Sequence, residues 1–142
     1  MRAATPPLAD QAARDRIASD LGSTLFVEAG AGSGKTRALV ERVIALIGSG
    51  VAIENIAAIT FTEKAGAELR DRIRDRLHSP DVQGALGADV AEAALRQLDG
   101  AAVGTLHSFA QRLLSEHPVE AGLPPSVEVL DDIGSQIEFD LR

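Results

Sequence analysis

The stretch AGAGSGKT, residues 29–36, constrains the fold more than any other part of this sequence. It follows a short apolar run and precedes a segment whose apolar residues recur at helical spacing. Its glycines at alternate positions let the backbone turn so that several N–H groups face one concavity. A helix that begins at residue 35 directs its N-terminal dipole and its free donors at the same place. The stretch therefore predicts an anion-binding loop between a strand and a helix.

Within this loop, one lysine and one hydroxyl have the spacing of a P-loop. Lys35 can reach the β- and γ-phosphates of a nucleotide, and the Thr36 hydroxyl can ligate Mg²⁺. Ala29 occupies the first position, where the pattern has glycine, but the glycines after it preserve the freedom of the backbone. A turn that only links two elements is the alternative, and it does not need Gly-Lys-Thr at this spacing. We expect a nucleotide site formed by Ala29, Gly30, Ala31, Gly32, Ser33, Gly34, Lys35 and Thr36.

Expected strands and helices alternate along the chain, with connections long enough to cross over a sheet. Such alternation is typical of α/β proteins with a parallel sheet flanked by helices. The alanine-rich stretch 82–98 is compatible with a helix, although Gly84 and Gly87 weaken its start. We expect strands at 24–28, 55–62, 101–105 and 126–130, and helices at 10–20, 35–47, 63–77, 107–116 and from 131 onward.

The composition excludes several classes of protein. There is no cysteine, so disulfides and thiolate metal sites are excluded. The net charge of −7 argues against a protein that coats nucleic acid with a broadly basic face. No apolar run approaches the roughly 20 residues of a membrane span, and the N-terminus lacks the apolar core of a signal peptide. Together these features favour a cytoplasmic protein without membrane contacts.

Three further stretches narrow the kind of nucleotide-binding protein. They are DQAARDRIAS upstream of the loop, ITFTEKAGAELRDRI at the second expected strand, and GTLHSFAQRLL at the third. In this order and spacing, together with the loop, they resemble the superfamily 1 DNA helicases of the UvrD/Rep/PcrA type. Glu63 and the later segment VEVLDD favour the RecB/AddA-like branch. The resemblance covers nearly the whole chain.

The resemblance implies a RecA-like P-loop fold, the first motor domain (1A) of an ATP-dependent 3′→5′ DNA helicase in repair or recombination. It divides the chain into a flexible tail at 1–9 and the N-terminal part of the ATP-binding domain at 10–142. The acid pair of the Walker B motif arrives later in such helicases. We therefore expect this chain to retain part of its affinity for ATP and Mg²⁺ without hydrolysing ATP. A helicase–nuclease partner subunit is compatible with the branch.

The resemblance also assigns roles to single residues. Gln11 would hydrogen-bond the adenine edge, and Arg37 would lie beside the nucleotide. Lys35 and Thr36 would be the catalytic residues, with Thr36 also holding Mg²⁺. An aromatic side chain at the DNA site can stack on a base for about 1–3 kcal/mol. The residues expected to contact single-stranded DNA are Phe61, Thr62, Lys64, Thr105 and His107.

Each of these assignments has a structural alternative. Gln11 can be a solvated side chain, Phe61 can belong to the core, and His107 can cap a helix. Gly66 stands where the family more often has alanine, which costs the helix about 1 kcal/mol. The segment 127–132 imitates a strand with a Mg²⁺-binding acid, but in the helicases that this chain resembles a similar segment leads into an inserted subdomain. A kinase, another P-loop enzyme and a nucleotide-binding assembly module stay open as alternatives for the whole chain.

Overall fold

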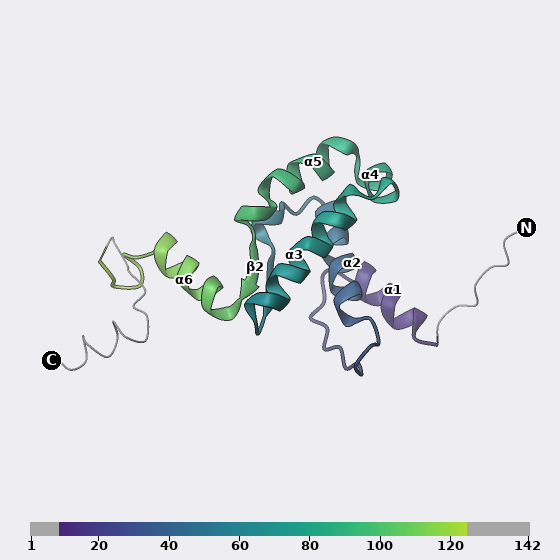
Figure 1. Cartoon of the computed structure of the whole chain (residues 1–142), viewed down its shortest axis with the longest axis horizontal. Coiled ribbons are helices and arrows are strands. Elements are labelled where there is room, and N and C mark those ends of the chain that lie inside the picture. The colour runs from purple at the N-terminus through teal and green to yellow at the C-terminus, as the bar shows by residue number, and fades with distance from the viewer. Residues whose placement is uncertain (1–8, 125–142) are drawn as a thin grey trace, which may run out of the picture.

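The computed structural model describes residues 9–124 (Figure 1). Its elements in chain order are α1 (Gln11–Ser19), α2 (Lys35–Gly48), η1 (Ile53–Asn55), β1 (Ala57–Thr60), α3 (Glu63–His78), α4 (Pro80–Leu86), α5 (Ala88–Gln97), η2 (Leu98–Gly100), β2 (Ala102–Thr105) and α6 (Leu106–Glu116). The strand expected at 126–130 and the helix expected from 131 lie outside the described residues. So does the expected tail, apart from residue 9.

The two described strands form a parallel sheet, in which Ala57 lies opposite Ala102 and Thr60 opposite Thr105. The chain passes from β1 to β2 through α3, α4 and α5, because parallel strands require a crossover. Both strands end at the same edge, so the segments that follow them leave the sheet side by side. The α/β class with a parallel sheet flanked by helices is thereby confirmed for two of the expected strands.

Helices α2 and α3 supply much of the apolar core. On α3, Leu69, Ile73 and Leu77 are spaced by one helical turn and are buried. Burying each such side chain stabilises the fold by about 1.5–3 kcal/mol. Leu39 on α2 is 38% exposed. The buried residues of α2 are Val40, Val43, Ile44 and Ile47.

The prediction of a strand at 24–28 is wrong. The backbone from 20 to 34 is irregular, and Phe26 in its middle is 94% exposed. A strand needs a neighbouring strand to complete its backbone hydrogen bonds. Neither β1 nor β2 lies beside this segment, since the two strands pair only with each other. The apolar composition indicated a strand, but a partner strand decides whether one forms.

Gly87 divides the alanine-rich stretch 82–98, whose composition is compatible with a helix. Its φ of 90° and ψ of 141° end α4 and begin α5 in a new direction. The turn lets α5 fold back along α3, and Val82, Ala94 and Leu98 are buried in the core beside α3. Figure 1 shows the pair of helices on the side of α3 away from the loop that precedes α2. A glycine is favoured here because the backbone has a positive φ.

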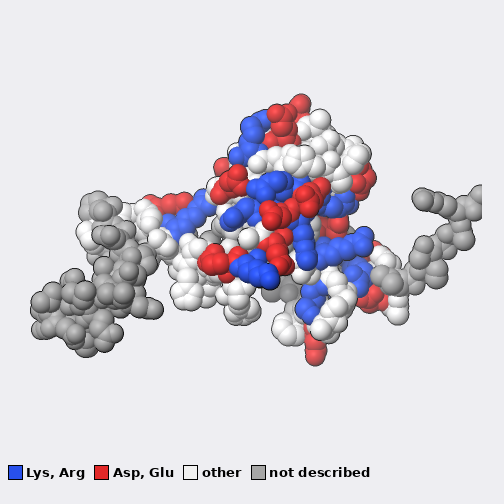
Figure 2. All heavy atoms as spheres, in the orientation of Figure 1, with Lys and Arg blue, Asp and Glu red and all other residues white. Residues whose placement is uncertain are grey.

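Charged side chains of both signs alternate over the middle of the molecule, where α3 crosses the view (Figure 2). That face shows no continuous basic area, in agreement with the acidic net charge of −7. None of the helices between residues 9 and 124 is long and apolar enough to cross a membrane.

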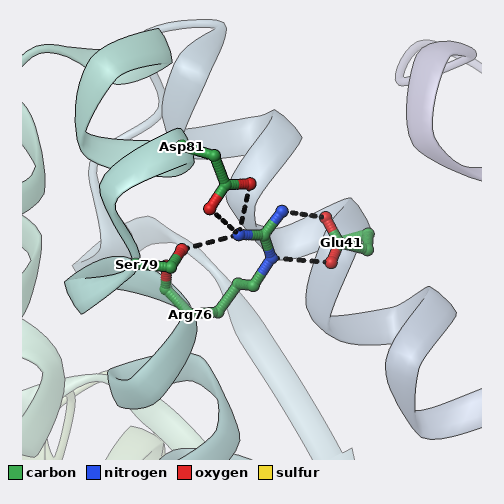
Figure 3. A network of polar contacts seen from close by, with 4 residues as sticks. All are labelled: Glu41, Arg76, Ser79 and Asp81. Atoms are coloured by element: carbon green, nitrogen blue, oxygen red, sulfur yellow. Dashed lines mark hydrogen bonds and ion pairs between the residues drawn. The ribbon is translucent and has the colours of Figure 1, made fainter. Parts of the chain in front are cut away.

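One arginine of α3 connects three helices (Figure 3). Arg76 Nε donates to Glu41 of α2 (2.8 Å), and its Nη1 donates to Asp81 of α4 (2.8 Å) and to the Ser79 hydroxyl (2.6 Å). The hydrogen bond with Glu41 and that with Asp81 raise the pKa of Arg76. The same bond with Arg76 lowers the pKa of Asp81. The cluster fixes α4 against α2 and α3.

Candidate nucleotide and DNA sites

The glycine-rich loop enters α2 through backbone that favours glycine. Gly32 and Gly34 have φ values of 75° and 87°, and Gly34 is the residue that precedes the first turn of α2. Residues with a side chain adopt such angles rarely, so the positions explain the alternate glycines of the sequence. Inside the loop, the Ser33 hydroxyl donates to the Gly30 carbonyl (2.8 Å). The loop therefore ends at the N-terminus of a helix, as an anion site requires.

Lys35 and Thr36 occupy the first turn of α2. The Lys35 ammonium folds back over the loop and donates to the carbonyls of Ala29 (2.8 Å) and Gly30 (2.7 Å). The exposed ammonium and the half-buried Thr36 hydroxyl suit a nucleotide with Mg²⁺. Between residues 9 and 124, no cluster of three or more His, Asp or Glu side chains could hold a metal ion by itself.

Gln11 and Arg37, which come from α1 and α2, line one open cavity of about 240 Å³. Gln11 is half-buried, and its side-chain amide donates to Asp15 at 2.7 Å. Arg37 lies on the first turn of α2, two residues after Lys35. The structure thus brings together Gln11, which the resemblance assigns to the adenine edge, and Arg37, which it places beside the nucleotide. Their contact with adenine stays a prediction.

Arg14 also belongs to this region, although none of the sequence motifs includes it as a site residue. Its Nη2 donates to the Ser33 carbonyl in the loop (2.6 Å) and to Asp10 (2.7 Å). The hydrogen bond from Arg14 lowers the pKa of Asp10. Arg14 lies three residues after Gln11, so helical spacing places both on one face of α1. That spacing was a signal that could have revealed it.

Arg42 on α2 was missed as well. Its Nη1 donates to the carbonyls of Ile17 (2.7 Å) and Asp20 (3.0 Å), which lie at the end of α1. Carbonyls in the last turn of a helix lack partners within the helix, and an arginine satisfies them well. Arg42 therefore attaches α1, and with it Gln11, to α2. The sequence gives no sign of this contact, because the partners are main-chain atoms far away along the chain.

The residues expected at DNA gather at the edge where β1 and β2 end. Phe61 follows β1 and is fully exposed, so the alternative that it belongs to the core is wrong. Lys64 and His107 are exposed nearby on the first turns of α3 and α6. The Thr62 hydroxyl accepts from the Ala65 N–H (3.1 Å) and so caps α3. Contact of these residues with DNA stays a prediction.

Thr105 is different, because it is only 5% exposed and its hydroxyl is already engaged. It donates to Glu63 Oε1 (2.8 Å) and accepts from the Ser108 N–H (3.2 Å) at the start of α6. Thr105 thus caps α6 and ties it to the first residue of α3. The direct contact with DNA that the resemblance implies for Thr105 stays a prediction.

The N-terminal turn of α3 packs directly on the backbone of β2. A Cβ atom at Gly66 would lie 3.0 Å from the Cα of Gly104. A Cβ atom at Gly104 would lie 2.8 Å from the Ser108 hydroxyl oxygen. Close packing against β2 therefore explains why this chain has glycine at position 66, where the family more often has alanine.

A glycine-rich loop that leads into a helix starting with Lys and Thr, beside a parallel sheet with crossover helices, defines a P-loop nucleotide-binding protein. A family model described as the UvrD/REP helicase N-terminal domain matches residues 9–140. The chain belongs to this family.

Relatives of two kinds resemble the chain. It is 45% identical over 123 residues to DNA helicase II of Haemophilus influenzae. The aligned region covers 83% of this chain and 14% of the relative. It is 36% identical over 122 residues to an ATP-dependent helicase/nuclease subunit of Streptococcus uberis, over 81% of this chain and 10% of the relative. The corresponding subunit of Levilactobacillus brevis is 38% identical over 122 residues, over 84% of this chain and 10% of the relative. The chain thus spans 10–14% of the length of these relatives.

Proposed function

We propose that this chain forms the ATP-binding part of an ATP-dependent DNA helicase that moves 3′→5′ along single-stranded DNA. The observation that carries the proposal is the left-handed glycine loop that ends at Lys35 and Thr36 on α2, in a chain of the UvrD/REP family. Residues 10–142 would be the N-terminal part of the RecA-like domain 1A.

Different residues of the site would bind different parts of the nucleotide. Backbone N–H groups and the Lys35 ammonium would hold the phosphate oxygens, Gln11 would hydrogen-bond the adenine edge, and Arg37 would lie beside the nucleotide. Thr36 would supply one ligand to Mg²⁺. Bound magnesium neutralises charge on the phosphates and supports phosphoryl transfer.

The edge formed by residues 61–64 and 106–107 would hold single-stranded DNA. Phe61 offers an exposed aromatic face on which a base can stack, for about 1–3 kcal/mol. Lys64 and His107 offer donors for phosphates. Closure of a second RecA-like domain over the nucleotide would shift these contacts along the strand.

The same proposal includes the cellular process, the compartment and the partner of the whole protein. We place it in DNA repair or recombination in the cytoplasm, in agreement with relatives whose names are DNA helicase and helicase/nuclease. For the helicase/nuclease relatives, the word subunit suggests a second chain, which we propose here as a helicase–nuclease partner.

The proposal is tested with Lys35→Ala in the full-length protein. Removing the ammonium from the phosphates is expected to lower ATP turnover stimulated by single-stranded DNA by at least about 100-fold. Steady-state ATPase and strand-displacement assays measure the loss, and the unchanged affinity of the variant for single-stranded DNA serves as its control.

Two results would favour another function. Turnover that single-stranded DNA does not stimulate would indicate a kinase or another P-loop enzyme. Unwinding that survives Lys35→Ala would contradict the motor and leave a nucleotide-binding assembly module.

A further inference from the structure

We propose that Arg14 is a positioning residue of the nucleotide site, which holds the phosphate-binding loop in its binding shape from the outside. The inference rests on the proposed function, because it concerns how the same loop binds ATP. It assigns a role in nucleotide binding to a residue outside the glycine-rich loop and outside the pair Gln11 and Arg37.

The first argument is the contact between Arg14 and the loop. Arg14 is on α1, yet its Nη2 lies 2.6 Å from the carbonyl oxygen of Ser33, a part-buried bond between segments far apart in the chain. A Cβ atom at Gly34 would lie 3.2 Å from Nη1 of the same guanidinium. Gly34 therefore satisfies two demands, a φ of 87° and the close approach of Arg14. The guanidinium packs against the last peptide unit before α2.

The second argument is the geometry of that peptide unit. In a trans peptide, the C=O and the N–H of one unit point in opposite directions. The described residues contain no cis peptide bond. Because Arg14 holds the Ser33 carbonyl on one side, the Gly34 N–H of the same unit points away from Arg14. Fixing the carbonyl thus fixes one of the backbone donors that a phosphate would meet.

The third argument is the position of Arg14 between the two halves of the site. It lines the cavity of about 240 Å³ together with Gln11 and Arg37. It also lines a smaller cavity of about 100 Å³ together with Lys35 and residues of the loop. A single side chain therefore contacts the surroundings of both the base and the phosphates.

The charge of Arg14 alone does not account for this arrangement. Asp10 accepts from Arg14 Nε (3.0 Å) and from Nη2 (2.7 Å), so a carboxylate already neutralises the guanidinium. Asp10 thereby orients the guanidinium toward Ser33. A residue that acted only through long-range attraction of phosphates would not need this second contact.

The experiment compares Arg14→Ala, Arg14→Lys and Arg16→Ala in the full-length protein. Arg16 lies on the same helix and carries the same charge, but it pairs with Asp20 and does not contact the loop. Calorimetry with Mg²⁺-ATP measures the dissociation constant for nucleotide, and fluorescence anisotropy without nucleotide measures that for single-stranded DNA.

We expect Arg14→Ala to weaken ATP binding by about five- to twentyfold, as loss of a charge-assisted hydrogen bond does. Arg16→Ala should bind ATP as the unmodified protein does, and single-stranded DNA affinity should stay unchanged in both. Arg14→Lys, whose ammonium can reach the Ser33 carbonyl, should restore part of the lost affinity.

Three results would overturn the inference. They are Arg14→Ala with unchanged ATP affinity, equal losses in Arg14→Ala and Arg16→Ala, and a folded Arg14→Lys variant with no recovery. Should Arg14→Ala unfold, the comparison of Arg14→Lys with Arg16→Ala decides: weaker ATP binding by folded Arg14→Lys than by Arg16→Ala would support the positioning role, and equal ATP affinities would contradict it. If the unmodified protein binds no nucleotide at all, the proposed function itself fails, which distinguishes the two cases.

Discussion

The two candidate sites of this chain are built in opposite ways. The candidate nucleotide loop ends an irregular segment at 20–34, which is held from outside by Arg14 at the Ser33 carbonyl and by Arg42 at the carbonyls of Asp20 and Ser23. The DNA edge lies at the end of two paired strands, where the backbones of α3 and β2 nearly touch at Gly66 and Gly104. The candidate nucleotide site depends on a few hydrogen bonds between residues far apart in the sequence. The candidate DNA site depends on close packing.

This difference predicts where each site is vulnerable. A backbone that is positioned by side-chain donors can lose its shape without loss of the core. A close-packed junction cannot accept an added atom without shifting the strand or the helix. Mutations at the DNA edge should therefore reduce stability first, and mutations around the loop should reduce nucleotide affinity first.

The largest loss of stability is expected for Gly66→Val. Its side chain must displace the backbone of β2, because even a Cβ atom would lie 3.0 Å from the Gly104 Cα. We expect the free energy of unfolding to fall by about 1–3 kcal/mol. Urea unfolding of the chain measures it. Gly84→Val is the matched control, since no atom lies within 4 Å of a Cβ atom at that helical glycine, and equal losses in both would contradict the close packing.

Thr105→Val is expected to have an intermediate effect. Valine keeps the buried shape but leaves the Ser108 N–H without its cap and Glu63 without its donor. The loss of such a cap costs about 1–2 kcal/mol. Urea unfolding checks the stability, and Thr105→Ser, which keeps the hydroxyl, should lose much less. A Thr105→Val variant as stable as the unmodified chain would show that the hydroxyl contributes nothing to the junction.

The smallest loss of stability is expected for Arg42→Ala, which frees the carbonyls of Ile17 and Asp20 at the end of α1. These groups become accessible to water, so we expect a loss of about 1 kcal/mol or less. Nucleotide affinity should fall more clearly, because α1 carries Gln11. Arg96→Ala, at an exposed intrahelical pair with Glu92, is the control. An unchanged ATP dissociation constant in Arg42→Ala would contradict the expectation that mutations around the loop reduce nucleotide affinity first.

Much of the DNA edge was accessible from the sequence. The run of apolar residues in β1 and β2 and the spacing of Leu69, Ile73 and Leu77 indicated parallel strands with a helix packed on them. The resemblance assigned both Phe61 and His107 to the DNA site, and the strands that precede them do end at one edge of the sheet. It did not reveal that Thr105 is buried, since burial of a hydroxyl depends on the Glu63 and Ser108 atoms around it.

The sequence by itself determined the glycine-rich loop before α2, because the left-handed angles at Gly32 and Gly34 and the helix start at Lys35 are local properties of the backbone. Tertiary structure alone decided that residues 24–28 form no strand, because their hydrogen bonds depend on a neighbouring strand that β1 and β2 do not provide. It also decided that Arg14 and Arg42 hold the loop and α1. Their acceptors are main-chain carbonyls that come near only after the chain has folded.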